Sequence, residues 1–433
     1  MMSKLLNQMP NLSRRHVLGS AGLLGLFAAM PGYARAMANG DYALIRKQVE
    51  DYVSSKKVAG MLVSLGFGTQ TPALIGSGTL ALDIPTPVDA DSLWRVYSMT
   101  KPIAGMAAMM LIEQGKLGLD RPIADFIPEF ANMKVLTDPA NSLDATPART
   151  QITPRHLMTH TAGLGYNIVT KGPLLEEYNR LGINPAAVSK TPIPGFPMPA
   201  PTPPIDEFAR RVASLPLIAE PGTIWSYSIG LDLLGYVIQV ASGMELGAYM
   251  RKNLFDPLGM TSSYWTVPQS EVPRLSTNYV PFSGALIPVD PAQDSIFTTP
   301  PAFPFGGSGL VSSARDYDRF LAMLVGRGQL DGTRVMSERT ALMGMSNLLP
   351  DTAVTKGTWV EDQGFGAGGR VGLGNAKGPA GTYGWGGAAG TVAFVDHIRG
   401  FRASGYTQYM PAETYPFQRE FGKMVYDQLQ AMN

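Results

Sequence analysis

The stretch Ser98-Met99-Thr100-Lys101-Pro102-Ile103-Ala104-Gly105-Met106-Ala107-Ala108-Met109-Met110-Leu111-Ile112-Glu113-Gln114-Gly115 predicts the helix around which the rest of the chain is organised. Its apolar residues recur at three- and four-residue spacing, which is typical of an amphipathic helix with its apolar side turned inward. Pro102 fits near the helix start, where the first amides lack intrahelical partners. Gly115 fits as a left-handed C-cap. Ser98 and Lys101 lie one turn apart and therefore share a face at the N-terminal end of the helix.

Ser98 and Lys101 together suggest a nucleophile and its base. A serine hydroxyl is a poor nucleophile until a neighbouring base takes its proton, and a lysine can be that base only where burial disfavours its charged form. The Ser-x-x-Lys spacing also arises by chance, and it recurs from Ser54 to Lys57 in a polar run that we expect at the end of a surface helix. We therefore interpret Ser98 as the site and Ser54 as a surface residue.

The composition is that of an ordered globular protein. The 433 residues are 45% hydrophobic and 16% charged, which argues against disorder, and a chain of this length can bury one large core or two smaller ones. The formal net charge of +1 gives no reason to expect nucleic acid or an anionic surface as a partner. The absence of cysteine excludes disulfides, thiol catalysis and thiolate metal sites.

Residues 1–38 have the pattern of an export signal. SRRHVLG at 13–19 is a twin-arginine signature, and a short apolar run at 21–30 precedes candidate cleavage sites near Ala36 and Ala38. The apolar run is too short to be a transmembrane anchor. Because the twin-arginine route carries folded proteins, we expect a bacterial periplasmic protein with no stable membrane anchor.

Strand-like segments lie near both ends of the mature chain, and helices dominate its middle. Strands are predicted at 61–66, 73–79, 93–97, 364–373, 391–395 and 401–409, and helices at 43–57, 205–215, 230–241, 245–254 and 413–432. Helix starts are predicted at Thr153, Ser313 and Ser337, which fit as N-caps. Strand-rich ends around a helical middle predict one α+β domain split in sequence by a helical insertion. Eight prolines between 185 and 204 predict a stiff loop, either a linker or a lid.

Three other patterns are poor indicators of function. His156 and His160 have the i, i+4 spacing of a metal-binding pair, but no glutamate follows His156 and the mature chain has only one further histidine, so a packed and hydrogen-bonded pair is favoured. GFGAGG at 364–369 matches a dinucleotide fingerprint without the following helix or the βαβ context. No Gly-x-Ser-x-Gly elbow occurs. A Ser-His-Asp hydrolase is therefore disfavoured, and we expect no metal and no cofactor.

Four segments in a fixed order resemble a known family: WRVYSMTKP at 94–102, ITPRHLMTHTAGL at 152–164, PGTIWSYS at 221–228 and GGSGLVSSARDY at 306–317. In these segments the chain resembles the class C β-lactamase-related serine hydrolases, and within them it is most similar to the family VIII carboxylesterases. The resemblance implies a β-lactamase/transpeptidase-like fold, in which an antiparallel sheet is flanked by helices and the active site lies between the sheet and a mainly helical second domain. It places the α/β sandwich domain at 39–125 and 275–433 and the helical domain at 126–274.

The resemblance also implies roles for particular residues. It makes Ser98 the nucleophile, Lys101 its partner and Tyr227 the second basic group, where a phenol beside Lys101 would pass the proton to the leaving group. It places Trp385-Gly386-Gly387-Ala388 on an edge strand beside the nucleophile, where two glycines allow close backbone approach. The backbone amides of Ser98 and Ala388 would then form the oxyanion hole.

Two departures from the β-lactamase pattern bear on the substrate. Ile229 stands where those enzymes have the asparagine of Tyr-x-Asn, and Trp385 stands where they have a cationic or imidazole residue. Both changes replace polar recognition by apolar surface. We therefore expect Trp385, Gly386, Gly387 and Ile229 to line a site for a small-molecule neutral ester with a small acyl group, cleaved through an acyl-serine intermediate.

Alternative readings remain at this point. One is a β-lactamase, a D-amino-peptide hydrolase or an amide hydrolase on the same fold, and another is a non-catalytic periplasmic binding module. The presence of Ser98, Lys101 and Tyr227 together argues against the binding module and against the peptide or amide hydrolase, and the departures at Ile229 and Trp385 argue against the β-lactamase.

Overall fold

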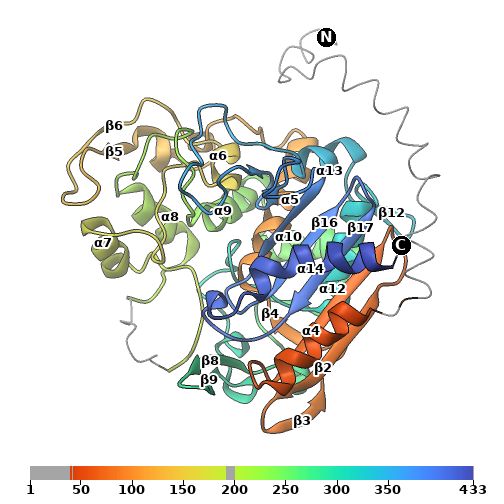
Figure 1. Cartoon of the computed structure of the whole chain (residues 1–433). Coiled ribbons are helices and arrows are strands. Elements are labelled where there is room, and N and C mark those ends of the chain that lie inside the picture. The colour runs from red at the N-terminus through yellow and green to blue at the C-terminus, as the bar shows by residue number, and fades with distance from the viewer. Residues whose placement is uncertain (1–39, 41, 192–199, 433) are drawn as a thin grey trace.

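The computed structural model describes residues 40, 42–191 and 200–432 (Figure 1). The predicted export signal at 1–38 and the central part of the proline-rich loop, 192–199, lie outside the described residues. Within the described part of the chain, no helix combines the length and the apolar character needed to cross a bilayer.

An antiparallel sheet of eight strands is the main β element, in the order β13-β14-β15-β16-β17-β1-β2-β3. β1 joins the two ends of the chain, because it pairs with β17 on one side and with β2 on the other. The predicted α+β fold, with both ends of the chain contributing strands, is confirmed. The strands are β1 (Gly60–Phe67), β2 (Ala73–Ala81), β3 (Ile84–Pro87), β13 (Gly364–Phe365), β14 (Arg370–Val371), β15 (Thr382–Gly386), β16 (Val392–Asp396) and β17 (Phe401–Tyr406).

Helices cover both faces of this sheet (Figure 1). α4 (Ala43–Ser54) and α14 (Phe417–Ala431) pack on one face, over a cluster that includes Val63, Phe401 and Phe421. α12 (Ala314–Val325) packs on the other face, against β1, β16 and β17. Because both faces are covered, β1 is buried along almost its whole length. A buried ion pair between Arg402 of β17 and Asp318 of α12, at 2.7 Å, joins the sheet to this helix.

α5 (Thr100–Glu113) is the predicted central helix, and it is more deeply buried than the sequence suggested. Every residue from Thr100 to Leu111 is buried, so the prediction of a single inward apolar side was wrong. The reason is that α5 contacts β15, α9 (Gly230–Ser242) and α13 (Glu338–Gly344), and so has neighbours all around it. The helix ends as predicted, because Gly115 has a φ of +70° and the amides of Gly115 and Lys116 bond back to its last turn.

A tight turn between β13 and β14 lies directly against α5. A Cβ atom on Gly105 would lie 2.1 Å from the Ala367 carbonyl oxygen, and one on Gly368, whose φ is +76°, would lie 2.2 Å from the Lys101 carbonyl oxygen. Only glycine fits at these two positions. The same turn divides the single strand predicted at 364–373 into β13 and β14.

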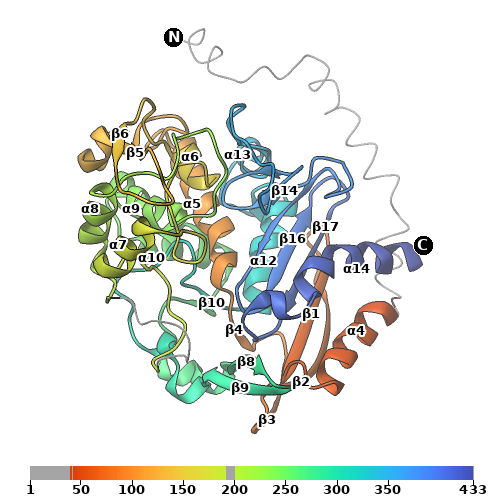
Figure 2. The ribbon, with the colours of Figure 1, turned by 60° about the vertical axis from the view of Figure 1, so that its left-hand side comes forward.

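The helical region lies beside the sheet, with α5 at the boundary between them (Figure 2). Its helices are α6 (Pro154–Met158), α7 (Pro173–Leu181), α8 (Ile205–Ala213), α9 and α10 (Leu246–Met250). The predicted N-caps are confirmed, because the side-chain oxygens of Thr153, Ser313 and Ser337 accept hydrogen bonds from the first turns of α6, α12 and α13. The division of the chain into domains at residues 126 and 275 stays a prediction.

A second, three-stranded sheet leads to Ser98. β4 (Leu93–Arg95) pairs with β10 (Val311–Ser313), which pairs with β7 (Ser263–Tyr264). Arg95 is completely buried and holds β4 in place through an ion pair with Asp290 at 2.5 Å. The remaining elements are α11 (Asp256–Leu258) and strands β5 (Lys134–Leu136), β6 (Ala145–Pro147), β8 (Asn278–Phe282), β9 (Ala285–Asp290), β11 (Gln329–Leu330) and β12 (Thr333–Arg334).

Candidate active site

Ser98 lies in a short 3₁₀ turn, Tyr97–Met99, between β4 and α5. Tyr97 has a φ of +42°, a conformation that is costly for a bulky residue. Its side chain is nevertheless buried, packed edge-on against Phe297 at 5.9 Å between ring centroids. Buried neighbours therefore hold the backbone in the conformation that presents Ser98 at the start of the helix.

The structure brings Ser98, Lys101 and Tyr227 together. Tyr227 Oη donates to Ser98 Oγ at 2.7 Å, and Lys101 Nζ donates to the same oxygen at 3.2 Å. Lys101 is completely buried and Tyr227 is 4% exposed. Two groups that can carry a proton are thus within hydrogen-bond distance of one serine hydroxyl, in a place that excludes most water.

The Lys101 amino group is held by a carbonyl oxygen and lies close to two aromatic rings. Nζ donates to the Gly307 carbonyl oxygen at 2.7 Å. It also lies 4.6 Å from the ring centroid of Tyr227 and 5.5 Å from that of Tyr166, distances at which a cation is attracted to the ring face.

A buried carboxyl group behind Gly307 completes this arrangement. Asp232 of α9 is 1% exposed, and its Oδ1 accepts a hydrogen bond from the Gly307 amide at 2.8 Å. Burial raises the pKa of Asp232 to about 7, although the positive charge of Lys101 opposes the rise. The backbone of Gly307 therefore connects Lys101, through the carbonyl oxygen, to Asp232, through the amide.

The sequence analysis did not identify Asp232 as part of the site. The signal was present, because Asp232 is the one charged residue in the otherwise apolar segment GLDLLGYVIQVAS of α9. A lone acid on a buried helix must find a partner, and that partner comes from a segment far away in the sequence.

His160 packs against Tyr227, and its side-chain hydrogen-bond partners differ from those of His156. Its Nδ1 accepts a hydrogen bond from the Ser228 amide at 3.1 Å, and its ring lies 4.7 Å from that of Tyr227. Burial, with the Lys101 charge adding to it, holds the pKa of His160 well below its usual range. His156 instead accepts from the Thr153 amide at 3.2 Å at the start of α6. Among the described residues, no three potential ligands gather in a metal-binding group.

Three aromatic side chains lie on one side of Ser98 and form an aromatic wall: Tyr227, Trp359 and Trp385. The ring of Tyr227 lies 5.0 Å from that of Trp359 and 5.8 Å from that of Trp385, and Trp385 also contacts Phe365 at 5.3 Å. Trp359 comes from the loop before β13 and was not identified from the sequence.

The strand predicted to lie at an edge of the sheet is β15, and only its C-terminal part is unpaired on one side. β14 pairs with Tyr383 and Gly384, so the register on that side stops before Trp385 and Gly386. Gly387 follows, and a Cβ atom there would lie 2.3 Å from the Val96 carbonyl oxygen. The end of β15 therefore lies against the segment that leads into Ser98, as the two glycines suggested.

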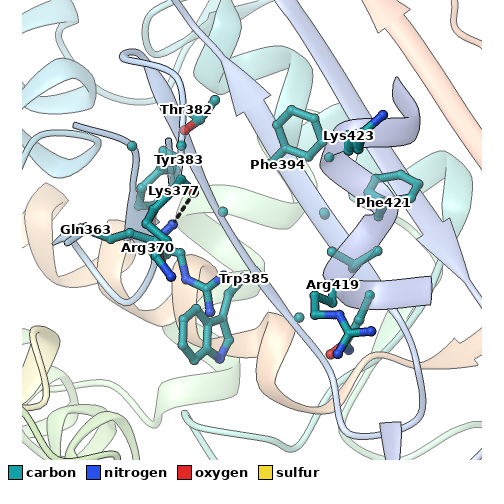
Figure 3. A pocket seen from close by; sticks show the side chains of 18 of the residues that line it. Gln363, Arg370, Lys377, Thr382, Tyr383, Trp385, Phe394, Arg419, Phe421 and Lys423 are labelled. Atoms are coloured by element: carbon teal, nitrogen blue, oxygen red, sulfur yellow. Dashed lines mark hydrogen bonds between the residues drawn. The ribbon is translucent and has the colours of Figure 1, made fainter. Parts of the chain in front are cut away.

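A pocket of about 1420 Å³ contains Ser98 and extends along β15, β16 and α14 (Figure 3). Ser98, Tyr227, Trp385, Gly386, Gly387 and Ala388 all line it. Ile229 does not. Its side chain is completely buried in the main core, so its predicted substrate contact stays a prediction without geometric support.

Fold and site together define a serine hydrolase of the β-lactamase type. The family model described as "Beta-lactamase" matches residues 45–421, and the chain belongs to this family. Esterase EstB of Burkholderia gladioli is 33% identical over 336 residues, which are 72% of this chain and 76% of that protein. Rv1367c of Mycobacterium tuberculosis is 34% identical over 327 residues, again 72% of this chain and 76% of that protein.

Solved structures show the same fold. The chain matches simvastatin synthase of Aspergillus terreus, in a mutant form, with a TM-score of 0.71 at 22% identity, covering 90% of this chain and 98% of that one. It matches EstCE1, described as a hydrolase with promiscuous acyltransferase activity, with a TM-score of 0.71 at 21% identity, covering 91% and 98%. The implied β-lactamase/transpeptidase-like fold is confirmed.

Proposed function

We propose that this protein is a carboxylesterase that cleaves esters of small acyl groups through an acyl-enzyme on Ser98. The observation that carries the proposal is the pair of short contacts to Ser98 Oγ, from Tyr227 Oη at 2.7 Å and from Lys101 Nζ at 3.2 Å. The B. gladioli relative is named an esterase, which supports the same reaction class.

In the proposed mechanism the Lys101–Tyr227 pair takes the proton of Ser98 while Oγ bonds to the ester carbonyl carbon. The carbonyl oxygen becomes an oxyanion and accepts hydrogen bonds from the amides of Ser98 and Ala388. The tetrahedral intermediate then expels the alkoxide, which takes a proton from Tyr227 and leaves as the alcohol. Water enters, gives up a proton to the same pair and bonds to the acyl carbon. The bond between that carbon and Oγ then breaks, and Oγ takes the proton back from the pair, so that the acid is released and Ser98 is restored.

Acyl transfer to an alcohol in place of water is the second candidate reaction. The aromatic wall of Tyr227, Trp359 and Trp385 favours it, since an apolar surface beside the acyl group binds an alcohol better than it binds water. Relatives that are named acyltransferases include calJ of Penicillium decumbens, 28% identical over 350 residues.

The deciding experiment compares a short-chain nitrophenyl ester with nitrocefin as substrates of the mature protein. We expect the ester to be turned over with the higher kcat/KM, because the aromatic rings of Tyr227, Trp359 and Trp385 beside Ser98 fit a neutral nitrophenyl group. Dominant nitrocefin hydrolysis would overturn the proposal in favour of a β-lactamase.

A fluorophosphonate probe separates the enzyme from a binding module. An activated Ser98 should be labelled covalently, and labelling should disappear in Ser98→Ala. An unlabelled, folded wild-type protein would support the non-catalytic alternative.

A further inference from the structure

One arginine in the pocket has no carboxylate beside it in the described part of the chain. Arg370 lies on β14, opposite Gly384 of β15, and lines the same pocket as Ser98. Its Nε atom is buried and has no hydrogen-bond partner among the described residues. Burial lowers the pKa of the Arg370 guanidinium, and no acidic neighbour offsets this effect. The ordinary pKa of arginine is so high that the group stays charged at neutral pH.

This arrangement differs from that of two deeply buried arginines in the described part of the chain. Arg95 is paired with Asp290, and Arg402 is paired with Asp318. Arg370 is half-buried, and a partly buried cation without a counter-charge carries a desolvation cost. A guanidinium left unpaired at the wall of an open pocket can instead be satisfied by an anionic group of a ligand.

Arg370 lies next to Trp385, on the Tyr227 side of the nucleophile. Its guanidinium carbon lies 5.0 Å from the ring centroid of Trp385, and the two side chains are adjacent (Figure 3). Trp385 in turn contacts the ring of Tyr227, which holds Ser98 Oγ. In the proposed mechanism Tyr227 protonates the leaving alcohol, so the alcohol half of the ester faces Trp385 and Arg370.

We propose that Arg370 binds a carboxylate carried by the alcohol half of the ester substrate, an inference that rests on the proposed function. A guanidinium presents a planar fork of N–H groups that matches a carboxylate, and stacking on Trp385 fixes the plane of that fork. This proposal revises the expectation, based on Trp385, that the substrate is a fully neutral ester. Trp385 stands on β15 where β-lactamases have a cationic or imidazole residue, and Arg370 places a positive charge on the neighbouring strand β14.

The test uses two esters that form the same acetyl-enzyme, 4-acetoxybenzoate and 4-acetoxybenzamide. The carboxylate and the amide are similar in size, so the ratio of their kcat/KM values reports recognition of the charge. We expect the wild type to prefer the carboxylate, and Arg370→Gln to lower that preference about 10- to 100-fold, as for loss of a charge-assisted hydrogen bond. Arg370→Lys should keep part of it, because the charge remains while the fork is lost.

Lys356→Gln is the matched control. Lys356 is an exposed cation in the loop that carries Trp359 and does not line the pocket, so its removal should leave the ratio unchanged. A second measurement avoids dependence on variant folding: 4-hydroxybenzoate should inhibit the wild type competitively and more strongly than 4-hydroxybenzamide.

The outcomes separate this inference from the function on which it rests. Equal turnover of the two esters by the wild type, or an unchanged ratio in a folded Arg370→Gln, overturns the role of Arg370 while esterase activity stands. Failure of the wild type to hydrolyse either of these esters or a nitrophenyl ester overturns the proposed function itself.

Discussion

The hydroxyl of Ser98 depends on residues that the sequence places far apart. Lys101 comes from the same helix, Tyr227 from the segment before α9, and Gly307 from the segment before β10. The sequence suggested Ser98 and Lys101, because they are one turn apart at the start of an apolar helix, whereas the second copy of the motif lies in a polar run. Tyr227 required a family resemblance, and Asp232 and Arg370 required the fold, because nothing local marks which distant backbone or ring a buried charge will meet.

Replacement of Ser98 tests the nucleophile, and the chain provides its own control. Ser98→Ala should reduce hydrolysis of a nitrophenyl ester by at least about 10³-fold, because no acyl-enzyme can form. Tyr227→Phe should leave a small residual rate, since the proton relay is lost while the nucleophile stays. Ser54→Ala changes the exposed copy of the same motif and should leave the rate unchanged. A Ser98→Ala variant with a near-normal rate would contradict the assignment.

Asp232 should make the folded protein less stable as the pH rises, which is the reverse of the usual effect of a carboxyl group. Its pKa rises from an ordinary 3.8 to about 7 in the folded protein, so the folded state holds a proton that the unfolded state has already lost. This contribution to stability is complete below about pH 4 and is lost as the pH rises through about 7.

Asp232→Asn removes that titration while keeping an oxygen for the Gly307 amide. Relative to wild type, the variant should gain free energy of unfolding between pH 4 and pH 8, by an amount on the order of a few kcal/mol. Urea unfolding of both proteins at the two pH values measures the difference. A difference that is the same at both pH values would refute the buried, protonated carboxyl group.

At the scale of elements, local signals predicted helix ends well and strand breaks poorly. Caps at Thr153, Ser313 and Ser337 depend on neighbouring residues, so the sequence was sufficient for them. The break between β13 and β14 depends on the approach of α5, which pairs Gly105 and Gly368 with distant backbone oxygens. The sequence showed glycines there but not what they face.

Two helical glycines provide a matched test of this contact. Gly105→Ala in α5 should lower the melting temperature and the esterase rate, because its Cβ would lie 2.1 Å from the Ala367 carbonyl oxygen. Gly422→Ala in α14, where nothing lies within 4 Å of the added atom, should stabilise the protein by about 0.5–1 kcal/mol through helix propensity. Thermal unfolding and the ester assay distinguish the two. Equal behaviour of the variants would mean that α5 and the turn are not in close contact.

At the scale of the whole molecule, the layers are joined by charges as well as by apolar packing. Asp318 pairs with Arg402 between α12 and β17 and is buried, whereas Asp331 pairs with Arg319 at the surface with 60% of its side chain exposed. Asp318→Asn should cost about 3–5 kcal/mol, since it leaves a buried guanidinium uncompensated. Asp331→Asn should cost about 0–1 kcal/mol. Denaturant midpoints give both values, and a similar small loss for Asp318→Asn would show that water reaches Arg402.

The pairing of β1 with β17 has a consequence for biosynthesis. The ribosome makes Ser98 early, but Trp385 and the strand that completes the sheet emerge only near the end of translation. We therefore expect a nascent chain that stops before β17 to carry an unactivated Ser98, so that activity begins only once the polypeptide is nearly finished.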